Sequence, residues 1–239
     1  MLQQTQVSRV MEKYKELLKK FPTVQELAKA PLSAVLKEWS GLGYNRRGKY
    51  LHDAARMIVE EHRGKFKEAL KYPLPGVGPY TRAAVGIFAF NEPDTLIETN
   101  IRAAFIYHFF TDARISTGRQ KYVRSEMVKD RDILTIARKA AEGQDPREWH
   151  WALMDYGAYL KRSGVRNNTL SAHYTKQSKF EGSVRQLRGV VLRDLRHGPL
   201  SHVALRRRLE ASPLYTAKAL EGLAKDGLIK KEKGNWRIA

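Results

Sequence analysis

The residues best suited to chemistry begin with a glycine-rich turn, Leu74-Pro75-Gly76-Val77-Gly78-Pro79-Tyr80-Thr81. Two glycines spaced two apart permit a tight hairpin with positive φ and the close approach of another backbone. Pro79 can open a helix whose free N–H groups point outward, so the turn could hold a phosphate without any side-chain charge. A lone Gly-x-Gly is common at helix corners, but the full motif before an apolar helix in a basic chain is more specific.

A second turn, Ser40-Gly41-Leu42-Gly43-Tyr44-Asn45-Arg46-Arg47, combines a flexible backbone with one aromatic residue and two cations. An aromatic side chain flanked by arginines suits insertion into a base stack, with the cations on phosphates. The alternative is a surface turn in which Tyr44 packs on Trp39. The residues alone leave both interpretations open.

Glu98 lies in Leu96-Ile97-Glu98-Thr99-Asn100-Ile101, directly before an apolar helix. Taken alone, its carboxylate could simply cap that helix through the helix dipole. Beside a turn that grips phosphates it has a second interpretation. Cleavage of a sugar–base bond develops positive charge on the sugar, and a desolvated carboxylate stabilises that charge.

Amphipathic helices would position these residues. Apolar residues at three- and four-residue steps predict helices around 7–21, 51–59, 101–109 and 151–159, and the apolar run 83–90 predicts a short core helix. Thr23 followed by Glu26 predicts a capping box. No alternating strand pattern occurs before about residue 180. We therefore expect a mainly α fold.

Composition narrows the possible partners and cofactors. The chain has 44 Lys and Arg against 25 Asp and Glu, a net charge of +19 (44 − 25), which favours nucleic acid as the partner. The chain has no cysteine, which excludes a disulfide, a thiolate zinc site and an iron–sulfur cluster. Its histidines are scattered along the sequence, so we do not expect a metal enzyme. We expect no cofactor. With no signal peptide and no membrane-length apolar run, we expect a cytoplasmic, nucleoid-associated protein that contacts no membrane.

The C-terminal part has a different pattern of apolar and polar residues from the rest of the chain. Residues 163–183 are polar and rich in turn formers, typical of a linker or an ordered surface crossing. Helices are predicted around 187–195, 203–209 and 213–228, the last with Ser212 as its cap, Pro213 at its first position and an end near Gly227. Two short strands turning at Gly234-Asn235 would follow. Three helices and a hairpin predict a winged-helix domain, the alternative being a helical extension with a frayed tail.

The longer motifs resemble those of the MutY-type adenine DNA glycosylases, within the endonuclease-III-like helix-hairpin-helix superfamily. They run in family order and at roughly family spacing over residues 1 to about 160: MLQQTQV, FPTVQELAKAPLSAVLKEWSGLGYNRR, LPGVGPYT, IETNIR and WALMDYGAYL. The resemblance implies a helix-hairpin-helix glycosylase domain over 1–182, with 163–182 as a clusterless loop or linker. The winged-helix domain over 183–239 would follow it.

The resemblance also implies an activity. Such enzymes flip a base out of double-stranded DNA and hydrolyse its glycosidic bond. The mispaired base would be adenine opposite 8-oxoguanine or guanine, and the enzyme would act as a monomer. Two alternatives stay open, a thymine or uracil mismatch glycosylase and a non-catalytic protein that senses lesions.

The site residues follow position by position from the same resemblance. Gln4 would enter the duplex at the lesion, Tyr44 would wedge into the stack, and the hairpin would grip a phosphate, with a monovalent cation possible on its backbone carbonyls but no other metal. The full set expected to bind DNA is Gln3, Gln4, Thr5, Tyr44, Arg46, Arg47, Leu74, Gly76, Val77, Gly78 and Thr81.

Three residues are expected to be catalytic. Glu98 stands where the family has its catalytic aspartate, and Asn100 matches the family asparagine two residues later. Tyr80 occupies the position of the Schiff-base lysine of the lyase relatives, which implies a monofunctional N-glycosylase.

Four departures from the family pattern matter. The general-acid glutamate would stand two residues before Met1, so we expect a misassigned start or impaired activity. Glu98 is longer than aspartate by one methylene, about 1.5 Å. The four cluster cysteines are missing, so ordinary packing and hydrogen bonds must hold that segment. The domain that inspects oxidised guanine is absent, which leaves the opposite-base preference open.

Overall fold

The computed structural model describes residues 1–111, 127–175, 179–209 and 211–239 of the chain. Most of these residues are helical, so the predicted mainly α fold is confirmed. By its contacts the chain divides into two compact units, one made of Met1–Gly76 with Ser178–Ala239 and the other of Val77–Gln177.

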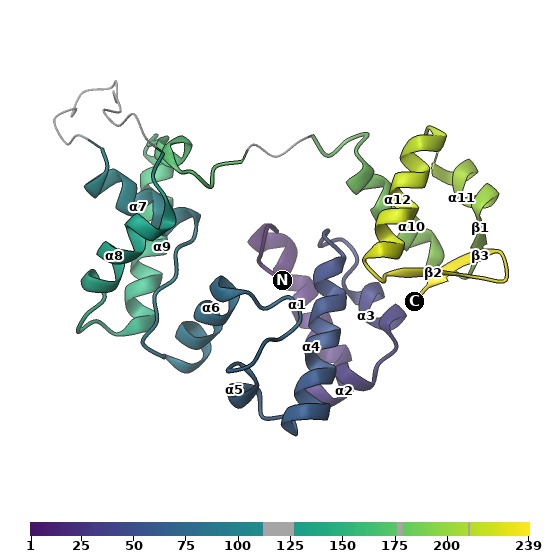
Figure 1. Ribbon diagram of the computed structural model, residues 1–239, viewed down its shortest axis with the longest axis horizontal. Coiled ribbons are helices and arrows are strands. Elements are labelled where there is room, and N and C mark those ends of the chain that lie inside the picture. The colour runs from purple at the N-terminus through teal and green to yellow at the C-terminus, as the bar shows by residue number, and fades with distance from the viewer. Residues whose placement is uncertain (112–126, 176–178, 210) are drawn as a thin grey trace. The chain divides into compact units, whose positions relative to one another are not determined.

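The first unit contains both ends of the chain (Figure 1). Its N-terminal helices are α1 (Val7–Lys20), α2 (Val24–Lys29), α3 (Leu32–Glu38), α4 (Arg46–His62) and α5 (Phe66–Ala69). Its C-terminal elements are α10 (Val184–Leu195), β1 (Leu200–Ser201), α11 (His202–Leu209), α12 (Pro213–Lys225), β2 (Ile229–Glu232) and β3 (Asn235–Ile238). The second unit contains α6 (Pro79–Phe90), α7 (Thr99–Phe109), α8 (Asp130–Ala140), α9 (Pro146–Arg162) and the 3₁₀ helix η1 (Asn167–Leu170).

The capping box predicted at Thr23 is present. The Thr23 hydroxyl oxygen accepts from the Glu26 backbone N–H at 3.2 Å, and the Glu26 carboxylate accepts from the Thr23 N–H at 3.2 Å. Each of these bonds satisfies a backbone donor that the start of α2 would otherwise leave open. The sequence therefore located the start of α2 correctly.

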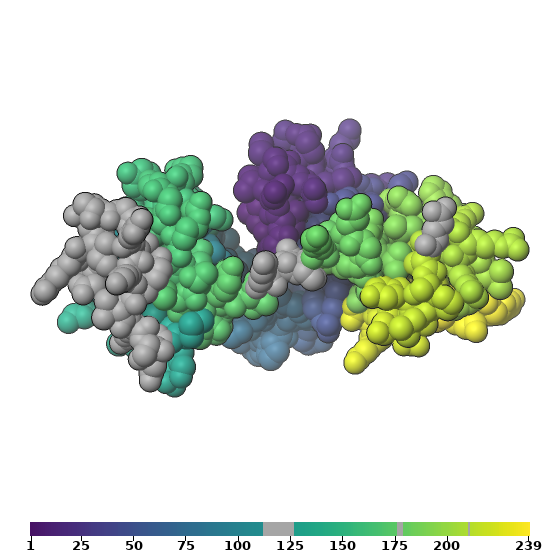
Figure 2. All heavy atoms as spheres, turned by 90° about the horizontal axis from the view of Figure 1, so that it is seen from above, coloured from purple at the N-terminus to yellow at the C-terminus, as the bar shows by residue number. Residues whose placement is uncertain are grey.

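The C-terminal part of the first unit folds around its own apolar cluster. Helices α10, α11 and α12 bury leucines that include Leu205, Leu220 and Leu223, and the strands pair antiparallel in the order β1-β3-β2. In Figure 1 the β2–β3 hairpin lies across one end of these helices, and in Figure 2 the green-to-yellow atoms of this segment form one compact body. The alternative of a frayed tail is wrong. The winged-helix assignment stays a prediction.

The turn of that hairpin lies one residue earlier than predicted. Glu232 pairs with Asn235, so the two loop residues are Lys233 and Gly234, not Gly234 and Asn235. Both loop residues have positive φ, 46° and 80°, the backbone of a type I′ turn. The predicted position put Asn235 in the turn, whereas it is the first residue of β3.

The apolar cluster of the C-terminal segment also includes a residue from the start of the chain. Leu36 of α3 is buried in it, and Leu32 packs against it. The division by contacts therefore groups residues 1–76 with the C-terminal segment, whereas the expected division lay between residues 182 and 183. The expected domains follow family resemblance rather than contacts, and they stay a prediction.

In the second unit, hydrogen bonds tie the segment predicted to lack a metal cluster to α7 and to the residues just before α8. The buried Asn167 side chain donates to the Ala103 carbonyl of α7 at 2.8 Å. Val128 and Ser171 form a parallel bridge, with Val128 N–H donating to the Leu170 carbonyl at 2.8 Å. Ordinary hydrogen bonds hold these residues, as the sequence predicted.

No helix among the described residues is long and apolar enough to cross a bilayer.

Candidate DNA-binding and catalytic site

The glycine-rich turn uses its two glycines differently. Gly76 has φ +70°, and a Cβ there would stand 2.6 Å from Tyr50 Cβ, so both its backbone and its neighbour require glycine. Gly78 has φ −82° and ψ −179°, which any residue adopts, and a Cβ there would meet nothing within 4 Å. The expectation of positive φ is thus confirmed at Gly76 and wrong at Gly78.

Gly78 is the N-cap of α6, and Pro79 is the first residue of that helix, as predicted. Gly78 has no side chain that could cap this helix. Leu74 is buried, Val77 and Thr81 are partly exposed, and Gly76 and Gly78 are exposed. Exposed backbone N–H groups at a helix start can donate hydrogen bonds to a phosphate oxygen.

The N-terminal residues form a short loop fixed by Arg47. Gln4 is exposed and has φ 55°, a left-handed conformation that is uncommon for a residue with a Cβ. The Thr5 hydroxyl donates to the Leu42 carbonyl at 3.0 Å, and it accepts from Arg47 Nη2 at 2.8 Å. The exposed Gln3 offers its carbonyl oxygen to Arg47 Nη1.

Arg47 therefore points inward and not toward solvent. Besides the bonds to residues 3 and 5, it donates to the carbonyls of Met1 at 3.0 Å, Leu42 at 3.1 Å and Gly43 at 3.2 Å. The sequence predicted that Arg47 binds DNA. If it bound a phosphate, some of these hydrogen bonds would have to break. Arg46 is different, because its side chain is 55% exposed and its Nη1 lies 3.6 Å from Asp226 Oδ1.

Tyr44 also lies in the left-handed region, with φ 45°. The Arg47 guanidinium lies over two rings of this turn, 5.5 Å from the Trp39 centroid and 5.6 Å from the Tyr44 centroid. On α10, Arg185 donates to the Tyr44 hydroxyl at 2.9 Å. Neither of the two interpretations of this turn included an arginine from the C-terminal segment.

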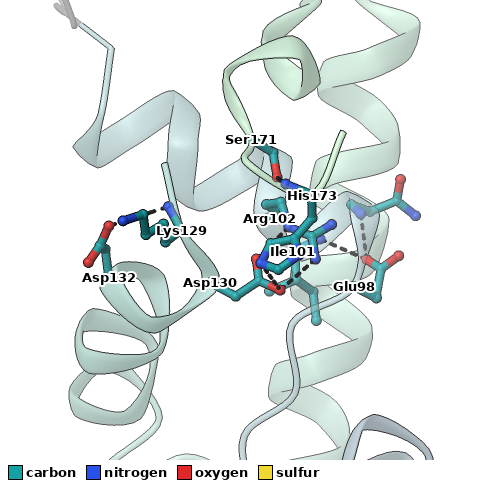
Figure 3. A network of polar contacts seen from close by, with 9 residues as sticks. Glu98, Ile101, Arg102, Lys129, Asp130, Asp132, Ser171 and His173 are labelled. Atoms are coloured by element: carbon teal, nitrogen blue, oxygen red, sulfur yellow. Dashed lines mark hydrogen bonds and ion pairs between the residues drawn. The ribbon is translucent and has the colours of Figure 1, made fainter. Parts of the chain in front are cut away.

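Glu98 is the N-cap of α7, and one of its oxygens holds the helix start. Oε1 accepts from the backbone N–H groups of Asn100 and Ile101, each at 2.7 Å (Figure 3). The capping interpretation is confirmed, and it does not exclude the catalytic one. Oε2 has no hydrogen-bond partner among the described residues, so one carboxylate oxygen remains available to a substrate while the other fixes the group.

Tyr80 lies within electrostatic reach of that carboxylate. Burial raises the pKa of the Tyr80 phenol above its usual range, and the charge of Glu98 raises it further. Tyr80 as a whole is 43% exposed, so it is accessible from outside. The structure thus brings together the three residues predicted to be catalytic, Tyr80, Glu98 and Asn100.

The start of α7 is held in place from two further sides. Arg102 forms a bidentate ion pair with Asp130, with Nε to Oδ1 at 2.7 Å and Nη2 to Oδ2 at 2.8 Å. His173 Nε2 lies 3.7 Å from the same carboxylate (Figure 3). On α9, Gly157 approaches the Asn100 carbonyl so closely that a Cβ there would be 2.0 Å from the oxygen. Neighbouring elements thus fix the position of Glu98.

Comparison with known proteins places this site in a family. Residues 1–142 match the family model described as "HhH-GPD superfamily base excision DNA repair protein". The match covers more than half of the chain, from the N-terminal loop through the hairpin and Glu98. The chain belongs to the HhH-GPD superfamily.

Several relatives within the superfamily are adenine DNA glycosylases. The chain is 44% identical to the rat adenine DNA glycosylase over 104 residues, 42% of this chain and 20% of that protein. It is 28% identical to the Mycolicibacterium smegmatis adenine DNA glycosylase over 255 residues, 97% of this chain and 82% of that protein. The match thus spans about a fifth of the length of the mammalian relatives and most of the mycobacterial one.

A solved structure gives the same fold assignment. The structure of a thermostable thymine-DNA glycosylase matches with a TM-score of 0.52 and 25% identity, covering 66% of this chain and 69% of that one. The helix-hairpin-helix glycosylase fold predicted for the first two-thirds of the chain is therefore confirmed.

Two residues of this HhH-GPD site escaped prediction. Arg185 lies 141 positions from Tyr44 and belongs to a segment without a recognised family motif. Gly157 lies within the motif WALMDYGAYL, and a glycine inside a helix is itself a signal of close packing. No group of three or more metal-binding side chains occurs among the described residues.

Proposed function

We propose that this HhH-GPD protein is a monofunctional DNA N-glycosylase that hydrolyses the glycosidic bond of adenine mispaired with 8-oxoguanine or guanine. The observation that carries the proposal is the fixed carboxylate of Glu98 beside the phenol of Tyr80. The adenine DNA glycosylases among the relatives, one of them matched over 97% of this chain, support adenine as the base.

The geometry suits stabilisation of a sugar cation. As the bond from sugar to base breaks, positive charge develops on the sugar, and Glu98 Oε2 would face that charge while Oε1 stays bonded to α7. Neither Glu98 nor the neutral Tyr80 is an amine able to form a Schiff base with the sugar. Simple hydrolysis by water is therefore the expected outcome.

Double-stranded DNA is the proposed partner, and the surface charge supports it. Within residues 183–239, 13 Lys and Arg against 5 Asp and Glu leave a net charge of +8 (13 − 5). Eight of these cations are exposed and form no ion pair with any described residue: Arg206, Arg207, Arg208, Lys218, Lys225, Lys230, Lys231 and Lys233. Unpaired exposed cations favour a polyanion. We expect a monomer that acts in the cytoplasm on the nucleoid.

The decisive experiment is single-turnover base release from four duplexes, with adenine opposite 8-oxoguanine, adenine opposite guanine, thymine opposite guanine and uracil opposite guanine. We expect adenine release, and we expect Glu98→Gln to slow it about a hundredfold or more. Glu142→Gln is the matched control, because Glu142 is an exposed glutamate of the same unit. Full activity of Glu98→Gln would contradict the role given to Glu98.

A version that carries Glu-Val directly before Met1 would measure what a carboxylate at that position contributes. If that carboxylate acts as a general acid, the extended version should release adenine faster from the same duplex. Equal rates would show that this chain works without the upstream carboxylate.

A second candidate is thymine or uracil excision from mismatches with guanine. The structural likeness to a thymine-DNA glycosylase favours it, and the same four duplexes distinguish it from the first. Tight binding without release from any duplex would instead identify a lesion sensor.

A further inference from the structure

Two arginines converge on the N-terminal loop and on the turn that carries Tyr44. Arg47 donates from both Nη atoms to five oxygen acceptors on residues 1–5 and 42–43. This single side chain therefore ties the loop that carries Gln4 to the turn that carries Tyr44. Both segments and the arginine lie within the first unit.

The second arginine comes from the C-terminal segment. Arg185 of α10 donates to the Tyr44 hydroxyl at 2.9 Å, and its guanidinium lies 5.6 Å from the Tyr44 ring centroid. The same guanidinium lies 5.3 Å from the centroid of Phe180. Because Arg47 also contacts the Tyr44 ring, two guanidinium groups hold this one tyrosine.

The backbone shows why such support is needed. Only five described residues other than glycine have positive φ, and two of them are Gln4 and Tyr44. A residue with a Cβ keeps a left-handed conformation only where its surroundings impose it. The two residues predicted to enter the duplex are therefore held in conformations that a free loop would rarely adopt.

We propose that Arg47 and Arg185 are positioning residues that hold Gln4 and Tyr44 ready to enter the duplex, so that the C-terminal segment takes part in opening the base stack. This inference rests on the proposed function for the roles of Gln4 and Tyr44, and it gives the C-terminal segment a task. An ordered wedge loses less conformational entropy on insertion than a mobile one. Removal of either arginine should therefore slow opening of the stack more than it weakens encounter with DNA.

The test follows opening of the stack directly. A duplex with adenine opposite guanine carries 2-aminopurine beside the target adenine, and its fluorescence after rapid mixing reports unstacking. We expect Arg185→Ala and Tyr44→Phe each to slow the rise roughly tenfold, the effect of losing one hydrogen bond to a charged group. The effects of the two changes should be less than additive in the double variant, because both remove the same hydrogen bond.

Arg193→Ala is the matched control. Arg193 lies on the same helix α10, its side chain is 60% exposed and it pairs with Asp194. It should leave the opening rate unchanged while removing the same formal charge. Arg185→Lys should recover only part of the rate, because an ammonium group can donate to the hydroxyl but lacks the planar group that lies over the rings.

Arg47 requires a milder change, because Arg47→Ala would leave several carbonyls without donors and could unfold the loop. Arg47→Lys retains the charge and replaces the fork of donors by one ammonium. We expect slower opening with little change in the midpoint of thermal unfolding. If the opening rate and the midpoint of thermal unfolding both fell, the result would show that Arg47 only stabilises the fold.

Several outcomes would overturn the inference. These are an opening rate for Arg185→Ala equal to that of Arg193→Ala, additive effects in the Tyr44 and Arg185 pair, or no opening signal from the unchanged protein. The proposed function fails separately. If no duplex releases a base while opening still depends on Arg185, the positioning role stands and the excision activity does not.

Discussion

Gly157 of α9 lies against the carbonyl of Asn100, where even one added carbon would stand 2.0 Å from the oxygen. This close approach sets how near α9 can lie to the start of α7, where Glu98 caps the helix. The position of the proposed catalytic carboxylate thus depends on a glycine in another helix.

Gly157→Ala should therefore cost both stability and activity. The added methyl group must push α9 away from α7, and we expect the free energy of unfolding to fall by about 1–3 kcal/mol. Base release should also slow, because the displaced helix start carries Glu98 with it. Urea unfolding and single-turnover kinetics measure the two effects.

Gly189→Ala is the control for that substitution. Gly189 also lies inside a helix, α10, but a Cβ there would meet nothing within 4 Å. Alanine favours a helix interior over glycine, so stability should rise by about 0.5–1 kcal/mol. If both variants lost stability equally, the close approach to Asn100 would not be the cause.

Substitutions at the two glycines of the glycine-rich turn should distinguish an effect on folding from an effect on DNA binding. Gly76→Ala faces Tyr50 and a positive φ, so we expect a loss of about 1–3 kcal/mol in the free energy of unfolding. Gly78→Ala should fold normally, since its backbone suits any residue and the space beside it is open.

The effect of Gly78→Ala should instead appear in DNA binding. Its methyl group would stand where a phosphate approaches the exposed helix start, and we expect the dissociation constant for duplex DNA to rise about tenfold, the effect of removing one charge-assisted hydrogen bond. Fluorescence anisotropy with a labelled duplex measures it. Unchanged affinity would show that the glycine-rich turn does not hold a phosphate at Gly78.

The titration of Tyr80 tests its closeness to Glu98. Burial and the charge of Glu98 both raise the pKa of the phenol above its ordinary value of 10.0, so Tyr80 should stay protonated when exposed tyrosines ionise. Glu98→Gln removes one of these two causes and should lower the pKa of Tyr80 toward the ordinary value. The difference in phenolate absorbance between each protein and its Tyr80→Phe variant isolates this one group.

The sign for stability follows from the same shift. Because the folded protein binds this proton more tightly than the unfolded chain, stability falls as pH rises above 10.0, the unfolded value, and through the folded pKa. Tyr80→Phe should weaken that fall. An identical alkaline loss in both proteins would mean that other groups cause it.

The salt dependence of binding tests the charge of the C-terminal segment. Lys230, Lys231 and Lys233 lie on the β2–β3 hairpin without an ion-pair partner among the described residues. Replacing all three by alanine should reduce the slope of log affinity against log salt by up to about 2.7, or about 0.9 for each phosphate that is no longer neutralised. Anisotropy titrations over a range of salt concentrations give the slope.

The matched control removes Lys13, Lys15 and Lys65, each of which pairs with a glutamate. Since those charges are partly neutralised locally, their removal should change the slope little. An equal change in both triple variants would mean that total charge, not the C-terminal hairpin, sets the slope.

Local patterns predicted most of the helices, because the pattern that specifies each helix lies within it. Thr23 and Glu26 located a capping box, and Ser212-Pro213 located the start of α12. The short strand β1 had no such signal, because two residues are too few to show alternation and its partner β3 lies some 35 positions later.

The residues of the candidate site also fall into those that a local motif predicts and those that only the folded structure shows. Glu98, Asn100 and Tyr80 could be predicted from motifs, because each motif carries its own residue. The contacts of Arg47 with the N-terminal loop and of Arg185 with Tyr44 could not be predicted in this way. The first join residues that are separated by 42 to 46 positions along the chain, and the second joins residues separated by 141 positions. A basic side chain beside an aromatic turn suggests phosphate binding, and only the folded chain shows that Arg47 uses its donors internally.

The burial of Leu36 among the C-terminal helices has a consequence for the order in which the protein can be made. Helix α3 leaves the ribosome early, but its apolar neighbours are translated about 150 residues later. Until then Leu36 is solvent-exposed on the nascent chain, a state prone to misassembly. The ribosome can therefore complete the second unit before the first, which must wait for its C-terminal segment.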